Sequence, residues 1–193
     1  MLIEDGRIGS FSRSETTHAA MGRFGNVMLV AGETDLALTA LRGEVVRLYL
    51  TNTANTRVFD VSIPGARMKL VGGDSGRCER EAFVDSVVIA PSERVVVDVL
   101  FERPGRLTLE HRTPERTYSL ATIDVADEEA PALPRDFDEL RTNPEWAVER
   151  ERIAPYLDAE PDKTLGLVAE MDLGTPEGPV VYSCPMHPQV VRE

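Results

Sequence analysis

Short runs of hydrophobic residues recur about every ten residues between residues 27 and 125, and each run is bounded by Gly, Pro, Asn or Asp. In the strongest runs apolar and polar positions alternate, so that Val46, Leu48 and Leu50 would face one way and their neighbours the other. This pattern is typical of strands that bury one face. The predicted strands are residues 27–30, 36–41, 45–50, 58–63, 68–71, 83–90, 95–101, 107–111 and 118–125. The physical interpretation is an all-β fold of two packed sheets.

The chain changes character near Val125, where an acidic stretch punctuated by prolines begins. Its composition is typical of a linker. Residues 1–125 contain 15 basic and 17 acidic residues, whereas residues 126–193 contain 6 and 16. We therefore expect four parts: a connecting segment at 1–12, a β-sandwich at 13–125, an acidic linker with one helix at 126–164, and a strand with an irregular tail at 165–193.

A helix is predicted in the linker, starting at Pro144. Asn143 can accept a hydrogen bond from a free backbone donor, and Glu145 suits the positive end of the helix dipole. The helix should run to about Ala154 and end at Pro155. Its apolar residues would bury a stripe against the sandwich or a neighbour; these are Trp146, Val148, Ile153 and Leu157. Residues 165–173 alternate like one more strand that has no evident partner.

The charge of the chain excludes some partners. It has 193 residues with 33 acidic and 21 basic side chains, a formal net charge of −12. Diffuse attraction to nucleic acid or to anionic lipid is therefore not expected. No apolar run reaches the roughly 18–20 residues that span a bilayer, and the first residues lack the pattern of a secretion signal. Two cysteines, Cys78 and Cys184, exclude a disulfide scaffold and leave a single bridge open.

Several segments together resemble a known family. They are Gly22–Val30 followed by Gly32-Glu33, Leu41–Leu48, Leu50–Phe59, and Ile89–Arg94 followed by Asp98. In this order and spacing they are similar to the middle cupredoxin domain of three-domain multicopper oxidases, over roughly residues 10–125. The chain departs from the family's usual motifs at Ala31, where Asn is frequent, and at Asp74-Ser75-Gly76, where Asp-Gly-Gly is frequent. The resemblance implies a cupredoxin-like Greek-key β-sandwich.

The resemblance also implies a role without catalysis. Copper in this family is held by a Cys thiolate and by His-x-His pairs, whereas the three histidines here, His18, His111 and His187, are scattered. The copper ligands are expected in flanking cupredoxin domains of a longer protein, with residues 2–7 and 165–173 leading to them. The chain alone is expected to be an inactive scaffold, while its parent couples one-electron oxidation of phenols or metal ions to reduction of oxygen. Members are commonly exported; homo-oligomerisation stays open.

The C-terminal segment Tyr182–Pro188 carries a second motif, Cys-Pro-Met-His-Pro. Cys184, Met186 and His187 form a soft ligand set suited to Cu(I) or zinc. The motif resembles the first half of a heavy-metal-binding module whose second half, Cys-Pro-x-Cys-Gly-Met, is absent. Weak metal binding is therefore expected at most. A metal-handling protein is the main alternative function, and an interaction module that recruits partners through its sheet edges is a third.

The other candidate residues are expected to be structural. Arg77 and Arg80 lie close to Cys78 and could activate its thiol. We expect instead a structural cysteine in a loop, because no histidine lies nearby in sequence. His18 lies in the segment that leads into the sandwich and His111 at the end of a predicted strand, and neither is expected to bind a ligand. Asp74 could suggest a cation-binding turn, but a single carboxylate among glycines usually marks a tight turn. The acidic stretch could attract a metal cation or a basic partner, but it is expected to be a solvated linker; its acids are residues 127–129, Asp136, Asp138 and Glu139.

Overall fold

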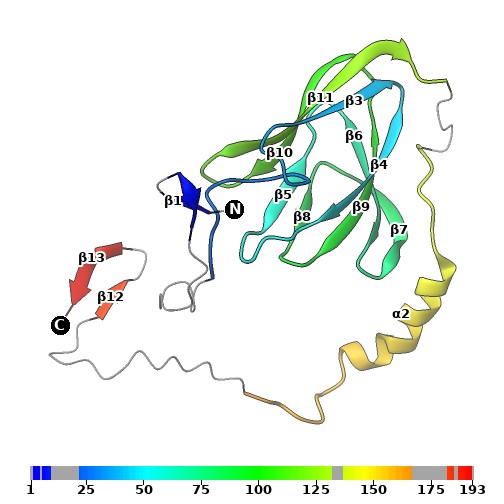
Figure 1. The fold of residues 1–193 in the computed structure, drawn as a ribbon. Coiled ribbons are helices and arrows are strands. Elements are labelled where there is room, and N and C mark those ends of the chain that lie inside the picture. Colours follow the sequence, from blue (N-terminus) through cyan, green and yellow to red (C-terminus); the bar gives the residue numbers. More distant parts are fainter. Residues whose placement is uncertain are drawn as a thin grey trace.

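The computed structural model describes residues 2–4, 6–9, 22–131, 137–166, 182–184 and 187–192. Two β-sheets pack face to face (Figure 1). The five-stranded sheet has the order β3 (Leu36–Arg42), β11 (Thr117–Glu129), β10 (Gly105–Arg112), β5 (Phe59–Ser62), β8 (Val87–Ile89). The four-stranded sheet has the order β4 (Val45–Thr51), β9 (Arg94–Leu100), β6 (Arg67–Gly73), β7 (Gly76–Val84). The predicted all-β sandwich is confirmed.

The chain repeatedly passes from one sheet to the other. β3 and β11 pair in parallel, and the other neighbours within the two sheets pair antiparallel. Two small hairpins lie outside the sandwich: β1 (Ile3–Glu4) with β2 (Arg7–Ile8), and β12 (Tyr182–Cys184) with β13 (His187–Arg192). Most pairings join strands that are distant in sequence, so the fold depends on non-local contacts.

The core lies between the sheets. Val97 and Val99 of the central strand β9 are completely buried, and the inward faces of β5, β10 and β11 pack against them. The alternation predicted for β4 is correct, since Val46, Leu48 and Leu50 pack on the core while Tyr49 is 74% exposed. Removing this apolar surface from water is the main stabilising contribution.

Two strand predictions need correction, and the first part of a third strand was not predicted. Residues 27–30 form no strand, because the chain turns back at Ala31 and Gly32 and makes only one bridge, between Val30 and Glu33. The predicted strand 83–90 is divided between β7 and β8, which belong to different sheets. β7 starts as early as Gly76. Its first residues are polar because an edge strand needs no continuous apolar face.

The sandwich also extends beyond the predicted boundary at residue 125. β11 continues to Glu129 and remains paired with β3, where Glu129 lies opposite Arg42. Arg42 forms ion pairs with Asp127 at 3.5 Å and with Glu129 at 3.7 Å. The acids at 127–129, expected in a solvated linker, therefore belong to a strand end. Their side chains are exposed, so these ion pairs contribute little.

Helix α2 (Pro144–Leu157) begins as predicted, and the Asn143 side chain accepts a hydrogen bond from the Glu145 amide at 3.2 Å. Its predicted end was wrong, because the helix continues through Pro155. Proline fits helical φ, and the lost hydrogen bond lies in the exposed last turn, where water can replace it. Among the described residues, no helix has the length and apolar character needed to cross a membrane.

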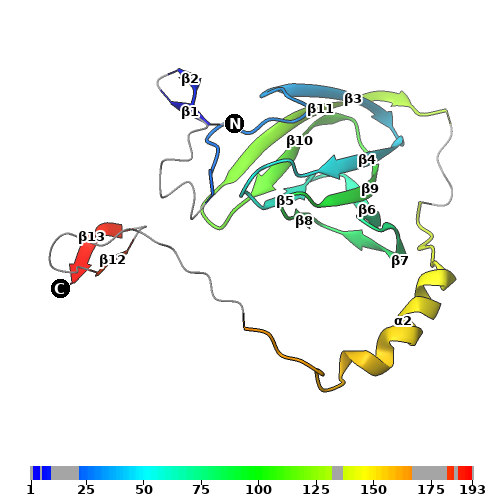
Figure 2. The same cartoon turned by 60° about the horizontal axis from the view of Figure 1, so that its bottom comes forward.

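The predicted buried stripe of the helix is also wrong. No residue of α2 is buried, and even Trp146 is 37% exposed; the others of the set are Val148, Ile153 and Leu157, all more exposed. The helix contacts β7 and then leads away from the sandwich, so little of its surface can be covered (Figures 1 and 2). In the predicted strand 165–173, Leu165 and Gly166 are not in a strand and residues 167–173 lie outside the described ranges.

Candidate functional site

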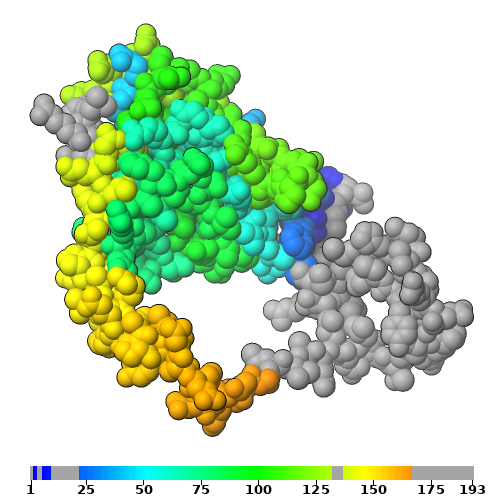
Figure 3. Space-filling model, turned by 180° about the vertical axis from the view of Figure 1, so that it is seen from behind, coloured from blue at the N-terminus to red at the C-terminus, as the bar shows by residue number. Residues whose placement is uncertain are grey.

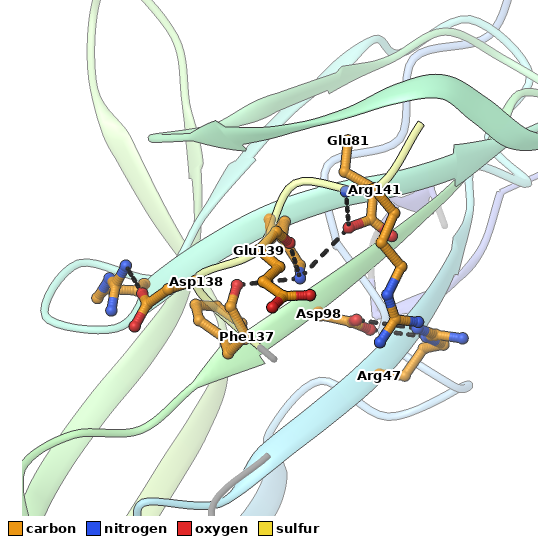
Figure 4. A network of polar contacts seen from close by, with 9 residues as sticks. Arg47, Glu81, Asp98, Phe137, Asp138, Glu139 and Arg141 are labelled. Carbon is orange, nitrogen blue, oxygen red and sulfur yellow. Dashed lines mark hydrogen bonds and ion pairs between the residues drawn. The ribbon is translucent and has the colours of Figure 1, made fainter. Parts of the chain in front are cut away.

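A buried lysine stands on the outer face of the four-stranded sheet. Lys69 of β6 is 3% exposed, because residues 137–139 of the linker cover it. Its ammonium donates hydrogen bonds to the carbonyl oxygens of Phe137 at 3.0 Å and Glu139 at 3.2 Å, and lies 3.4 Å from the Glu81 carboxylate (Figure 4). A buried ammonium is costly unless its donors are paired. Three acceptors surround it here.

Phe137 is the apolar anchor of this contact. It is 4% exposed and packs against Phe83 of β7, with ring centroids 5.8 Å apart. The Lys69 ammonium and the Arg67 guanidinium lie 5.0 and 5.2 Å from the Phe137 ring, in the range of cation–π attraction. Arg67 also pairs with Asp138 at 2.7 Å, and this hydrogen bond raises the pKa of Arg67.

The next linker residues lie along the edge of β7. The Glu81 amide donates to the Arg141 carbonyl at 2.9 Å, and the Arg141 amide donates to the Glu81 carboxylate at 3.1 Å. The Asn143 amide donates to the Glu79 carbonyl at 2.7 Å. Residues 137–143, which we call the docked linker, thus cover a sheet edge that would otherwise expose backbone groups. Figure 3 shows this part of the chain lying directly on the sandwich before the helix leaves it.

Two further ion pairs border the docked linker. Arg150 of α2 lies 3.0 Å from the Glu79 carboxylate and ties the start of the helix to β7. Arg47 of β4 forms two hydrogen bonds with Asp98 of β9, at 2.6 and 2.9 Å. The bonds to Asp98 raise the pKa of Arg47 above its usual value. The Arg47–Asp98 pair is bidentate, and such a pair favours one fixed geometry of the outer face.

His111, a candidate ligand by residue type, lies in the core. Its ring packs between Phe59 and Tyr118, with centroid distances of 4.8 and 5.5 Å. Nδ1 accepts a hydrogen bond from the Asp60 amide at 3.1 Å and also lies 3.4 Å from the Asp60 carbonyl, whereas the buried Nε2 has no hydrogen-bond partner among the described residues. Burial lowers the pKa of His111. These contacts describe a structural histidine, as the sequence predicted.

Cys78 was predicted to lie in a loop, but it lies in strand β7. Burial, and then the nearby Glu81 carboxylate, raise the pKa of its thiol, which opposes activation by the neighbouring arginines. Asp74 lies in the tight turn between β6 and β7, as predicted, and pairs with Arg94 at 2.8 Å. His18 lies outside the described residues.

The predicted metal ligands are only partly described. Cys184 ends β12 and His187 begins β13, where the two residues are register partners, while Met186 lies outside the described residues. Within the described ranges, no group of three or more His, Cys, Asp and Glu residues could hold a metal ion. Cys78 and His111 belong to different sheets. These donors therefore do not fit a copper centre built from a thiolate and imidazoles.

Sequence reasoning missed the residues of the docked linker site. Two signals were present: Lys69 interrupts the apolar run Met68–Val71, and Phe137 is an isolated aromatic residue in an acidic segment. Neither signal indicates its partner, which is 68 residues away in sequence.

Known proteins are similar to this chain in sequence and in fold. The profile of the family Cu-oxidase, multicopper oxidase, matches residues 13–109. Cell division protein FtsP of Salmonella typhimurium is 30% identical over 103 residues, which are 51% of this chain and 22% of that protein. The multicopper oxidase of Campylobacter jejuni, described as a metallo-oxidase, is 26% identical with a TM-score of 0.50, over 62% of this chain and 27% of that one. A multicopper oxidase of Pseudomonas thermotolerans is 25% identical with a TM-score of 0.57, over 70% and 32%.

The strand order and these likenesses define the class as a cupredoxin-like β-sandwich domain. The chain belongs to the multicopper oxidase family. Membership of this family implies copper as the cofactor. The chain spans about a fifth of the length of the curated relatives it matches.

Proposed function

We propose that this chain is the non-catalytic central scaffold domain of a multicopper oxidase-like protein. Its partners would be flanking cupredoxin domains of the same protein, which carry the copper and couple one-electron oxidation to reduction of oxygen. The share of each solved relative that it spans, 27% and 32%, is what one domain of three would give. Neither nucleic acid nor a membrane is needed for this role.

The docked linker is the observation that carries this proposal. A scaffold must control the position and direction in which the chain leaves it. Here the chain is held at Lys69 through two backbone carbonyls and at β7 through two backbone amides, and Arg150 extends the contact into α2. The direction of the helix is thus set by the sheet, which supports a fixed placement of whatever follows.

The scaffold role predicts that the chain has no oxidase activity of its own. After incubation with excess Cu(II) and removal of unbound metal, we expect no blue absorption band and oxygen consumption at background with a phenol, Fe(II) or Cu(I). The reason is that Cys78 and His111 belong to different sheets, and that no group of three or more metal-binding side chains is found among the described residues. The full-length Campylobacter jejuni enzyme serves as the positive control. A stoichiometric blue copper site in the isolated chain would contradict the proposal.

A second candidate function is metal handling through Cys184, Met186 and His187. One observation favours it: the hairpin β12–β13 places Cys184 and His187 opposite each other as register partners, so two of the three candidate ligands come from adjacent backbone positions. Thiolate and imidazole suit Cu(I) and zinc. Three ligands leave a tetrahedral site incomplete, so the binding would be weak or shared with a second molecule.

Metal titration tests this second function. We expect the chain to take up one Cu(I) or Zn(II) with low affinity, and the double variant Cys184→Ser, His187→Ala to lose at least about tenfold in affinity, because a thiolate and an imidazole are removed. Competition with a chromophoric chelator measures both. Cys78→Ser is the matched control and should bind as the unchanged protein does. Equal, negligible uptake by all three proteins would exclude metal handling.

A further inference from the structure

A large cavity opens at one end of the sandwich. Its volume is about 1070 Å³, at the upper end of the range of pockets that hold small organic ligands. The floor is formed by apolar side chains of both sheets, namely Leu50, Phe59, Val61, Ile89, Leu109 and Leu120. The remaining walls come from the segment that precedes β3, from Leu2 and Ile8, and from the loop after β4. Leu50 and Phe59 face the core yet remain half-buried, because the cavity reaches them.

The described lining of the cavity is opposite in charge to the protein as a whole. No Asp or Glu is among the described residues that line it, although the chain contains 33 acidic residues. Its charged lining residues are Arg23 and Arg57. The Arg57 guanidinium beside an apolar floor, in a chain of net charge −12, favours a ligand with an apolar body and an anionic group.

Arg57 is placed to receive such an anion. One Nη2 hydrogen bond, to the Gly25 carbonyl at 2.7 Å, fixes the guanidinium, and the group lies 5.7 Å from the Phe24 ring. No other hydrogen bond of this guanidinium is found within the described part of the chain. A guanidinium has five N–H donors in a fork that fits a carboxylate. Donors therefore remain for a ligand.

The walls are held in place before any ligand arrives. The buried Asn52 side chain donates to the carbonyls of Arg57 at 2.7 Å and Ile89 at 2.9 Å, and accepts from the Ala54 amide at 2.9 Å. The Asn26 side chain makes two hydrogen bonds of 2.8 Å with the backbone of Ile3, which ties the N-terminal hairpin to the segment before β3. Preformed walls reduce the ordering cost of binding.

We propose that this cavity binds a small amphipathic carboxylate, with its hydrocarbon chain on the apolar floor and its carboxylate at Arg57. The site is independent of copper and of the docked linker, which lies on the outer face of the four-stranded sheet. A neutral or cationic amphiphile would fill the same volume but could not accept hydrogen bonds from Arg57 through a carboxylate.

Calorimetric titration of the full chain with dodecanoate, below its critical micelle concentration, tests the proposal. We expect saturable binding of one dodecanoate, and at least about tenfold weaker binding of dodecanol and of dodecyltrimethylammonium, since both lack the charge-assisted hydrogen bond. Arg57→Gln should weaken dodecanoate binding by about tenfold or more. Arg152→Gln, the same charge change on α2 outside the cavity, should not alter it.

The location of the site is tested by filling it. Leu50→Trp places a larger side chain on the cavity floor and should abolish dodecanoate binding while the circular dichroism spectrum stays that of a β-protein. Absence of saturable binding to the unchanged chain would overturn the proposal, and so would equal affinity for the three amphiphiles. Binding that survives in a folded Leu50→Trp protein would also overturn it. Should Arg57→Gln or Leu50→Trp fail to fold, the amphiphile series on the unchanged chain decides.

Discussion

Replacing Lys69 by alanine is expected to lower the free energy of unfolding by about 3–5 kcal/mol, the range found when one partner of a buried ion pair is removed. The ammonium is 3% exposed and is the partner of the Glu81 carboxylate and of two linker carbonyls. Without it, the largely buried Glu81 carboxylate loses its ion-pair partner and the linker loses its anchor. Urea denaturation measures the change in stability.

Hydrogen exchange separates release of the docked linker from global destabilisation. In Lys69→Ala, the exchange rates of the Asn143 and Glu81 amides should increase relative to the unchanged protein, and by a larger factor than those of core amides of β9. The reason is that the acceptors of these two amides lie at the linker–β7 contact. Arg67→Ala is the matched control: it removes a cation from the same strand, but the group is more exposed, and we expect a loss of about 1 kcal/mol or less. A loss in Lys69→Ala no larger than in Arg67→Ala would show that the buried pair does not hold the linker.

The stability of the chain should also fall on mild acidification, because of His111. Burial, the largest cause, lowers the pKa of this histidine below the 6.5 of an exposed side chain, and the charge of Arg57 acts in the same direction. Between the folded pKa and 6.5 the unfolded chain binds more protons than the folded one. The free energy of unfolding should therefore rise with pH in this window, by up to about 1.4 kcal/mol per pH unit, and level off above about 6.5.

His111→Phe isolates this contribution from those of the acidic residues. Phenylalanine keeps an aromatic ring between Phe59 and Tyr118 but leaves the Asp60 amide without its acceptor. The variant should be less stable at neutral pH by about 1–3 kcal/mol. Its stability should decline less than that of the unchanged protein between pH 6.5 and 5. Denaturation midpoints at several pH values measure both effects, and parallel pH profiles of the two proteins would refute the assignment.

Most strands could be predicted from local pattern, but an edge strand could not. In β4 the alternation of Leu48 and Leu50 with exposed neighbours identifies both the strand and its inner face. β7 shows no such alternation, because it is the last strand of its sheet and needs no continuous apolar face. One of its edges pairs with β6 and the other with the docked linker. Two of its charged residues, Glu79 and Glu81, contact the linker and the helix. A polar strand of this kind can be recognised only when its partners are known.

The helix shows a second limit of prediction from local sequence. Asn143 and Pro144 determine its start through local hydrogen bonding and a fixed φ, and the structure agrees. The apolar residues of the helix led to a prediction of burial. Burial, however, depends on whether another surface lies opposite these residues, which local sequence does not show. The helix leaves the sheet after its first turns, so Ile153 and Leu157 are exposed.

By itself the sequence determined the all-β class, the family and most strand positions of this protein, since alternation and turn residues act over a few neighbouring positions. The burial of Lys69, the role of Phe137 and the cationic cavity at Arg57 were decided only by the tertiary structure. Each depends on segments that are far apart in sequence and meet only when the two sheets pack. Side-chain type and spacing carry no information about which distant backbone groups will become the partners of a buried charge.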